Sequence, residues 1–293
     1  MKRVLTTGVT GYIGSNLARA LLADSEVYGL VRRPLHTEYI ADIQDKLHLL
    51  EFDGSYESME AAVKEACPKV VYHLATYYTG AHSSTETPKL AESNIIMGSY
   101  LLEAMSACHV PALVYTSTVM AHFKGEAYRP LNLYAATKQA FSDLLAYYTD
   151  VGLLRAVTLV LTDTYGPGDH RPKVLNLIRA AAQSGEILEL SDGGQDYDAV
   201  YIDDVVQALR LAGTQLLGEQ WRNETFQVIP KQPLTLRETV DLMVQVNHLT
   251  LHAAWGKRPT LGRGIRKAIR CYPTLPGWEP ETSLEDGLKR LLN

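Results

Sequence analysis

Thr7-Gly8-Val9-Thr10-Gly11-Tyr12-Ile13-Gly14 is the stretch that decides the fold. It ends the apolar run Arg3–Thr7 and precedes Ser15–Leu22, where apolar residues recur at helical spacing. Glycines at these intervals permit a tight turn, let backbone amides approach a pyrophosphate and let the helix pack closely on the strand. The helix N-terminus then supplies free amides and a positive dipole end. The stretch predicts a dinucleotide-binding turn with contacts at Gly8, Thr10, Gly11, Tyr12 and Ile13.

Outward from this turn, short apolar strands alternate with helical stretches. The expected strands are Arg3–Thr7, Glu26–Val31, Leu47–Phe52, Val70–Ala75, Ala112–Thr116 and Ala156–Leu161. The expected helices between them are Ser15–Leu22, Met59–Glu65, Ile95–Ala107 and Ala135–Tyr148. Such alternation predicts an α/β fold, a doubly wound parallel sheet of the Rossmann type with helices on both faces. We assign residues 1–165 to this domain.

The pattern changes after Tyr165. Gly166-Pro167-Gly168 interrupts the chain, a helical stretch covers Lys173–Ser184, and Ser191–Gln195 is a polar loop. Open α/β sheets bind ligands at the carboxyl ends of their strands. We therefore expect residues 166–293 to form mainly a smaller substrate lobe over that edge, with some segments returning to the Rossmann sheet.

Composition narrows the class of protein. Of 293 residues, 46% are hydrophobic and 21% are charged, which is typical of a globular enzyme. The formal net charge of −5, with both signs scattered, argues against a nucleic-acid partner. Cys67, Cys108 and Cys271 lie far apart, which favours reduced thiols over disulfides or a zinc site. Because the first residues lead directly into a strand-like run, we expect no signal peptide, and no apolar run approaches the roughly 18 residues that span a bilayer. We expect a cytoplasmic homodimer without a metal or a membrane partner.

The end of the second expected strand bears on the choice of cofactor. NAD sites normally place Asp or Glu there for the adenosine ribose hydroxyls. This chain has Arg32 and Arg33 instead. A guanidinium pairs with a 2′-phosphate, which a carboxylate would repel. The two arginines favour NADP, as NADPH, over NAD; the alternative is a pair of solvated loop arginines.

A second motif is Tyr134-Ala135-Ala136-Thr137-Lys138. Its spacing places the Tyr134 phenol and the Lys138 ammonium on one helical face. A tyrosine with a pKa near 10 is a poor acid–base group, but a nearby ammonium favours the phenolate and lowers that pKa. We expect Tyr134 to transfer a proton. We expect Lys138 to lower the pKa of Tyr134 and to hydrogen-bond the nicotinamide ribose.

Further segments carry a resemblance to a known family. They are His73–Ala75, Pro130–Lys138, Tyr165–Asp169, Tyr201–Val206, Pro276–Pro280 and Ser283–Leu288. With these and the glycine-rich turn, the chain resembles the NAD-dependent epimerase/dehydratase family, the extended branch of the short-chain dehydrogenases/reductases. The resemblance covers nearly the whole chain, and most members act on nucleotide-diphosphate sugars. It implies cofactor contacts at Leu74 and Ala75, and at Asp53 to the adenine amine; the alternative for Asp53 is an Asx-turn.

The resemblance also implies a catalytic hydroxyl where the fifth strand ends. Thr118 matches that position, with Thr116 and Ser117 as alternatives if the register differs. Its hydroxyl would hydrogen-bond the substrate oxygen. The substrate pocket would also include Thr76. Tyr77 and Tyr78, after the fourth strand, either line the sugar pocket or only pack.

Departures from the family pattern bear on the substrate. Family dehydratases follow the threonine with Asp-Glu, whereas this chain has Val119-Met120, which disfavours dehydration. Tyr197 stands where relatives have a pyrophosphate-contacting arginine, and Arg258 stands where a second one is expected. Arg171 or Lys173 would substitute for the missing arginine.

Together these features favour NADPH-dependent reduction of the keto group of a nucleotide-diphosphate 4-keto-deoxyhexose. The chain is most similar in this respect to reductases that form abequose or paratose. Three alternatives stay open: a nucleotide-sugar epimerase, a non-sugar carbonyl reductase and a non-catalytic NADP-sensing regulator. Two polar residues receive structural interpretations, His73 as a satisfied core histidine and Asp203-Asp204 as a helix N-cap.

Overall fold

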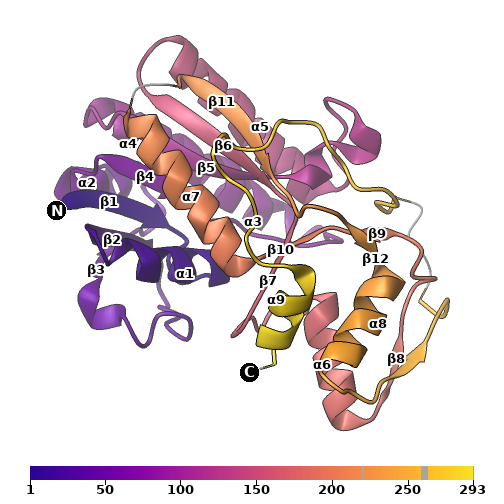
Figure 1. Ribbon diagram of the computed structural model, residues 1–293. Coiled ribbons are helices and arrows are strands. Elements are labelled where there is room, and N and C mark those ends of the chain that lie inside the picture. The colour runs from indigo at the N-terminus through magenta and orange to yellow at the C-terminus, as the bar shows by residue number, and fades with distance from the viewer. Residues whose placement is uncertain (219–220, 259–262, 293) are drawn as a thin grey trace.

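A computed structural model describes residues 1–218, 221–258 and 263–292 (Figure 1). At its centre is a seven-stranded sheet with the order β3-β2-β1-β4-β5-β6-β11 and every pairing parallel. The strands are β1 (Lys2–Thr7), β2 (Ser25–Val31), β3 (His48–Glu51), β4 (Val70–His73), β5 (Ala112–Thr118), β6 (Arg155–Leu161) and β11 (Asn223–Val228). This confirms the expected doubly wound sheet. The strand order reverses between β1 and β4, where such sheets open a crevice for ligands.

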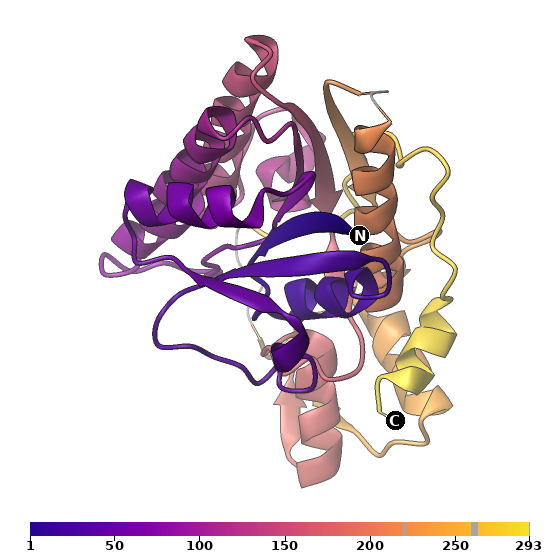
Figure 2. The same cartoon turned by 90° about the vertical axis from the view of Figure 1, so that its left-hand side faces the viewer.

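Helices cover both faces of the sheet. They are α1 (Tyr12–Leu21), α2 (Tyr56–Ala66), α4 (Met97–Ala107), α5 (Leu133–Asp150) and α7 (Ile202–Leu217). Figure 2 shows α7 on one side of the sheet and α2, α4 and α5, in purple, on the other. Two hydrophobic clusters result because successive β1 residues point to opposite faces. Val4 packs with α1 and α7, and Leu5 packs with α2, α4 and α5.

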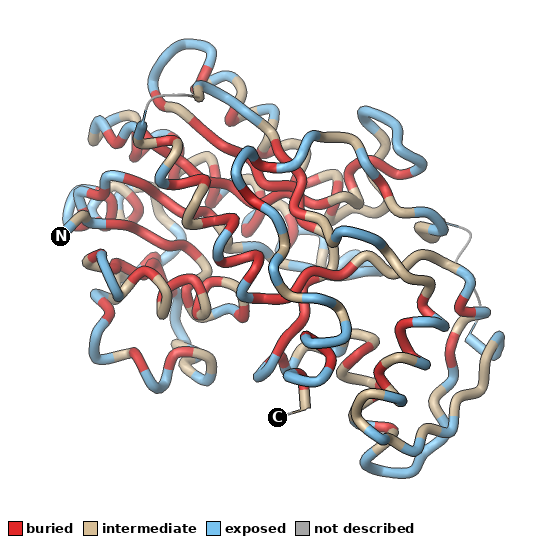
Figure 3. The backbone as a smooth tube through the Cα atoms, viewed as in Figure 1, coloured by how far each residue is buried: buried red, intermediate tan, exposed pale blue. Residues whose placement is uncertain are grey.

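Much of the chain after β6, apart from α7 and β11, forms a lobe at the carboxyl edge of the sheet. Its helices are α6 (Val174–Ser184), α8 (Leu236–Val246) and α9 (Leu284–Arg290). Its strands pair as β7 (Asp163–Tyr165) with β10 (Ala199–Tyr201), β8 (Ile187–Glu189) with β13 (His252–Ala254), and β9 (Asp196–Tyr197) with β12 (Leu234–Thr235). Buried residues run from the central strands into the lobe helices (Figure 3), and Ile178 and Val240 belong to the same cluster as Val4. The lobe therefore shares one core with the α1/α7 face.

The structure corrects one interpretation of the sequence. The helix α7 begins at Ile202 with Tyr201 as its N-cap, so Asp203 and Asp204 lie in its first turn and neither caps it. The Asp204 carboxylate instead accepts hydrogen bonds from the backbone amides of Glu281 and Thr282. The Asp204 carboxylate, which the sequence suggested as a helix N-cap, thus binds the C-terminal segment that contains Glu281 and Thr282.

No helix in the described ranges is both long and apolar enough to cross a membrane. Within the same residues, no group of three His, Cys, Asp or Glu side chains is placed to hold a metal ion.

Candidate active site

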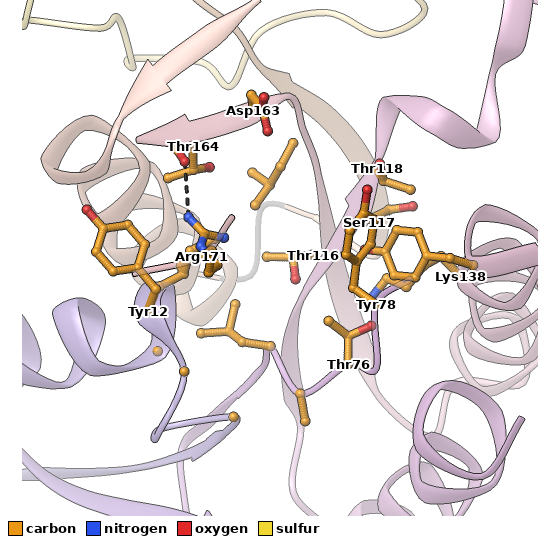
Figure 4. A pocket seen from close by; sticks show the side chains of 18 of the residues that line it. Tyr12, Thr76, Tyr78, Thr116, Ser117, Thr118, Lys138, Asp163, Thr164 and Arg171 are labelled. Carbon is orange, nitrogen blue, oxygen red and sulfur yellow. Dashed lines mark hydrogen bonds between the residues drawn. The ribbon is translucent and has the colours of Figure 1, made fainter. Parts of the chain in front are cut away.

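A cavity of about 1230 Å³ lies between the carboxyl edge of the sheet and the lobe. A single small-molecule site usually measures about 300–1,000 Å³, so this cavity has room for two ligands. Its wall includes the glycine-rich turn, the ends of β2, β4 and β5, the start of α5, and lobe residues on both sides of β9 (Figure 4).

The glycine-rich turn is shaped by close backbone approach. Gly8 has a φ of +72°, and a Cβ there would lie 2.8 Å from the Ala75 nitrogen. A Cβ on Gly14 would lie 2.1 Å from the Gly8 oxygen. Gly11 is the N-cap of α1 and has no side chain to bond the first amides, and no acidic residue occupies the first turn. These free amides fit a dinucleotide pyrophosphate, with Thr10, Tyr12 and Ile13 lining the cavity beside them.

Thr7 fixes the neighbouring end of β4. Its Oγ1 accepts the backbone amides of Leu74 and Ala75 at 3.2 and 3.1 Å, so its hydroxyl is left to donate to Nδ1 of His73 at 2.8 Å. Leu74 and Ala75 are thereby held in the cavity wall. Burial lowers the pKa of His73 to about 3, which makes it a neutral core histidine.

The two arginines after β2 have different surroundings. Both line the cavity and both are exposed. Arg33 Nε donates to the Glu51 carboxylate at 3.0 Å, at the end of β3. Arg32 makes no hydrogen bond or ion pair with any residue that the structure describes. Arg32 is therefore the guanidinium available to a ligand.

Asp53 is placed by a local turn. Its Oδ1 accepts from the Ser55 hydroxyl at 2.6 Å and the Ser55 amide at 2.9 Å. These bonds from Ser55, with a further one from Ser58, lower the pKa of Asp53 to about 2. The neighbouring Phe52 lines the cavity, whereas Asp53 does not belong to the described lining. The structure thus shows the Asx-turn, and the adenine contact stays a prediction.

The catalytic candidates converge on one side of the cavity. Tyr134 and Lys138 lie on the first turns of α5, which Asn132 caps by accepting the Ala135 amide at 2.9 Å. Thr118 ends β5, and its Oγ1 accepts the Met120 amide at 3.2 Å, so its hydroxyl hydrogen remains free to donate. All three line the cavity, and Figure 4 shows Thr118 and Lys138 on the same side. Thr116 and Ser117 line it as well.

Burial dominates the acid–base properties of this group. It raises the pKa of Tyr134 to about 12, against a smaller lowering by a hydrogen bond with Thr76. It also lowers the pKa of Lys138 to about 7. The Lys138 ammonium lies 4.3 Å from the Tyr115 ring centroid. Burial is the largest cause of both shifts, so the lowering of the Tyr134 pKa expected from Lys138 stays a prediction.

Asn94 is a supporting residue that the sequence did not reveal. It is buried in a π-helical turn, Glu92–Ile96, that precedes α4. Its Oδ1 accepts from the Thr76 hydroxyl at 2.9 Å and the Tyr77 amide at 2.7 Å. Its Nδ2 donates to the Thr137 hydroxyl on α5 at 2.9 Å. Asn94 therefore joins the loop that carries Thr76 to the helix that carries the catalytic tyrosine.

Tyr78 is a second residue whose place the sequence left open. Its ring meets the Tyr134 ring edge-on, with centroids 4.9 Å apart and planes at 83°. Burial raises the pKa of Tyr78 above its ordinary value, and Asp163 adds to the effect. Tyr78 lines the cavity, so it bounds the space in front of the Tyr134 phenol.

The lobe contributes charged pairs on the opposite wall. Arg171 pairs with the buried Asp169 at 2.7 Å, and Lys173 pairs with Asp163 at 2.5 Å. Tyr197 also faces Asp163, and burial first, then this carboxylate, raises the pKa of its phenol well above 10. Arg171, Lys173 and Tyr197 all line the cavity, together with Thr76.

Arg258 is not brought to this site. Its side chain is exposed, its amide donates to the Leu190 carbonyl at 3.1 Å, and it does not belong to the described lining. Sequence position alone does not specify this placement. Among the residues that the structure describes, Lys173 and Arg171 are the lobe cations that face the cavity.

Comparison with known proteins agrees with this geometry. CDP-abequose synthase of Yersinia pseudotuberculosis is 28% identical over 259 residues, which span 87% of this chain and 88% of that protein. The UDP-glucose 4-epimerase of Thermotoga maritima, solved with UDP-glucose, superposes with a TM-score of 0.86 at 25% identity, covering 99% and 97% of the two chains. The Thermus thermophilus UDP-glucose 4-epimerase, solved with NAD, gives 0.82 at 26% identity, again covering 99% and 97%.

The sequence profile of the NAD dependent epimerase/dehydratase family matches residues 4–223. That span includes the glycine-rich turn, Thr118, Tyr134 and Lys138, which the fold gathers around one cavity. Enzymes of this family use a nicotinamide cofactor, and the amides at the start of α1 fit one. The chain belongs to the NAD dependent epimerase/dehydratase family and is an oxidoreductase of the extended short-chain dehydrogenase/reductase type.

Proposed function

We propose that this enzyme uses NADPH to reduce the keto group of a nucleotide-diphosphate 4-keto-deoxyhexose. The observation that carries the proposal is the meeting of two features in one cavity. The Thr118, Tyr134 and Lys138 set lines it, and so does the Arg32 guanidinium, which pairs with no residue that the structure describes. The similarity to CDP-abequose synthase supports a deoxysugar substrate.

When bound, the reduced nicotinamide supplies a hydride to the carbonyl carbon. Tyr134 gives its phenolic proton to the carbonyl oxygen, so that the ketone becomes an alcohol. The Thr118 hydroxyl donates a hydrogen bond to the same oxygen as negative charge develops on it. Lys138 would hydrogen-bond the nicotinamide ribose. As an ammonium, it would also stabilise the Tyr134 phenolate that remains after the proton transfer.

The residues after Thr118 support reduction over dehydration. Val119 and Met120 line the cavity, and neither side chain can accept or donate a proton. Elimination of water from a sugar needs an acid and a base at the reacting carbons. This wall therefore favours a simple carbonyl reduction.

The test is a reduction assay with purified enzyme. Nucleotide-linked 4-keto-deoxyhexoses carrying CDP, UDP, GDP or dTDP are supplied with NADPH, and cofactor oxidation is followed together with the sugar product. We expect stoichiometric NADPH oxidation with at least one of them. If every keto sugar is left unreduced while a 4-hydroxy sugar nucleotide is inverted without net cofactor use, the protein is an epimerase. That second candidate is favoured by the structural likeness to UDP-glucose 4-epimerases.

The cofactor preference depends on Arg32. Arg32→Ala should weaken NADPH binding by about 1.5–3 kcal/mol, the value of a charge-assisted hydrogen bond, which is about tenfold to a hundredfold. NADH binding should be unchanged because it lacks the 2′-phosphate. Arg33→Ala is the matched control, with a smaller effect expected since Glu51 already engages Arg33. Calorimetric titration of the three proteins with each cofactor measures all six constants; equal affinity of the unmodified enzyme for NADPH and NADH would refute the preference.

The substrate diphosphate should depend on Lys173. Unpaired phosphate charges in a partly desolvated cleft cost several kcal/mol, so a lobe cation has to meet them. Lys173→Met should raise KM for the sugar nucleotide about tenfold or more, since it also leaves the Asp163 carboxylate without its partner. Arg258→Met, outside the cavity, serves as the control and should change KM less than twofold. A large effect of Arg258→Met with none at Lys173 would restore the assignment made from sequence.

The homodimer and the cytoplasmic location remain predictions, and a non-sugar carbonyl substrate remains an alternative that the reduction assay tests.

A further inference from the structure

We propose that Arg171, a lobe residue, binds the diphosphate of the nicotinamide cofactor and not the sugar nucleotide. The inference rests on the proposed function in so far as that function requires a bound dinucleotide. It reassigns a residue that sequence position had placed among the substrate contacts.

The position of Arg171 points to the cofactor half of the cavity. Its guanidinium carbon lies 4.7 Å from the ring centroid of Tyr12, which is the first residue of α1. Figure 4 shows Arg171 beside Tyr12, across the cavity from Thr118, Tyr78 and Lys138. The guanidinium therefore lies near the helix start at which a dinucleotide pyrophosphate is expected, and away from the reacting groups.

Three contacts hold the guanidinium in place. Its Nε and Nη2 donate to the two oxygens of Asp169, both at 2.7 Å, and Nη2 also donates to the Thr164 carbonyl at 3.0 Å. Asp169 is only 1% exposed, so this fork is anchored in the protein interior. Within the described chain, Nη1 makes no hydrogen bond. One face of a fixed cation thus remains for a ligand that the cavity admits.

The start of α1 needs such a cation. Its free amides and dipole offset part of a phosphate charge, and neither the Gly11 cap nor the first turn carries a charged side chain. A diphosphate brings two charges into a cleft partly closed from water. A guanidinium fixed in advance loses little side-chain entropy on binding, so its hydrogen bonds contribute more of their energy to affinity. Asp169 balances the charge of Arg171, so what Arg171 offers from the lobe is the remaining Nη1 donor of a fixed guanidinium, opposite the amides of the Rossmann domain.

The test measures cofactor binding without any substrate. NADPH and NADH are titrated calorimetrically into the unmodified enzyme and into Arg171→Ala, Arg171→Lys and His170→Ala. The control residue His170 is exposed and does not belong to the described lining of the cavity. Like Arg171, it connects the lobe to the Rossmann domain, in its case by stacking on Tyr39. Arg171→Ala should weaken both cofactors by the same factor, about tenfold to a hundredfold, because the diphosphate is common to both. Arg171→Lys should lose less, and His170→Ala less than twofold.

Two outcomes would overturn the inference. If Arg171→Ala and His170→Ala weaken binding equally, Arg171 only packs the lobe against the domain. If Arg171→Ala leaves both cofactor constants unchanged, Arg171 does not reach the diphosphate; a raised KM for the sugar nucleotide would then return it to the substrate. Competition by ligand fragments adds a direct check, since the variant should lose affinity for ADP-ribose but not for AMP. The test measures cofactor binding and no turnover. Its result can therefore be interpreted even if the reductase proposal or the NADPH preference fails.

Discussion

Tyr134→Phe should lower kcat for the reduction by about 10²–10⁴, the range expected when a general acid is lost. The substitution removes only the phenolic hydroxyl, so the ring contact with Tyr78 is kept. Cofactor affinity should therefore change little. Burial keeps the Tyr134 phenol protonated at neutral pH, with a pKa of about 12, and the proton needed by the carbonyl oxygen is present before each turnover.

Steady-state kinetics on the reducible keto sugar, with a parallel NADPH titration, measures this effect. Tyr78→Phe is the matched control, because it removes a hydroxyl from the neighbouring ring on the same cavity wall. We expect it to retain activity within about tenfold, as for a residue that shapes the pocket without transferring the proton. Activity near the unmodified level in Tyr134→Phe would exclude the short-chain dehydrogenase mechanism for this enzyme.

Lys138→Met should make the cofactor-free protein more stable while it damages catalysis. Lys138 is 3% exposed, and burial lowers its pKa from 10.5 to about 7. At neutral pH that shift costs about 4 kcal/mol of folding free energy relative to a solvated lysine, at about 1.4 kcal/mol per pKa unit. The contact with the Tyr115 ring returns about 2 kcal/mol when desolvated. We therefore expect the unfolding free energy to rise by about 2 kcal/mol in Lys138→Met, measured by urea denaturation.

The pH dependence gives this prediction a sign. The unfolded chain keeps its lysine proton up to pH 10.5, while the folded chain releases it near pH 7. Between these values the unfolded state binds more protons, so the stability of the unmodified enzyme rises with pH. From pH 7 to pH 9 it should gain about 2 kcal/mol relative to Lys138→Met. A stability difference that stays constant over this window would mean that Lys138 is not desolvated as the structure indicates.

The sequence identified those parts of the site that local spacing determines. The glycine-rich turn needs a strand, three glycines and a helix within 22 residues, and the structure has them in that arrangement. The spacing of Tyr134 and Lys138 likewise follows from one helix. Six strands were found because parallel strands are buried on both faces and appear as short apolar runs. Their ends differed from the structure by up to two residues, as at Thr118, which extends β5 beyond the expected Thr116.

The remaining site residues depend on contacts between distant segments. Asp53 looked like an adenine ligand, yet the serine two positions later competes for its carboxylate. Arg258 was assigned from motif position and Arg171 as a substitute for a missing arginine, but in the structure Arg258 is exposed outside the described lining and Arg171 lies against the Tyr12 ring. No sequence pattern marked Asn94 as a site residue. Its role depends on hydrogen bonds with Thr76 and Thr137, which lie 18 and 43 residues away in the sequence.

The place of β11 at the edge of the sheet bears on how the protein is made. In the sheet β11 pairs with β6, and its residue Gln227 also bridges Thr274. Residues 162–222, which include most of the strands and a helix of the lobe, are synthesised between β6 and β11. Until residue 228 has left the ribosome, β6 is an open edge whose amides and carbonyls can pair with another nascent chain. Pairing between such distant segments also slows folding. Completion of the seven-stranded sheet therefore waits on the synthesis of residues 162–222, so a polypeptide stalled between β6 and β11 would leave the edge of β6 open to pairing with another chain.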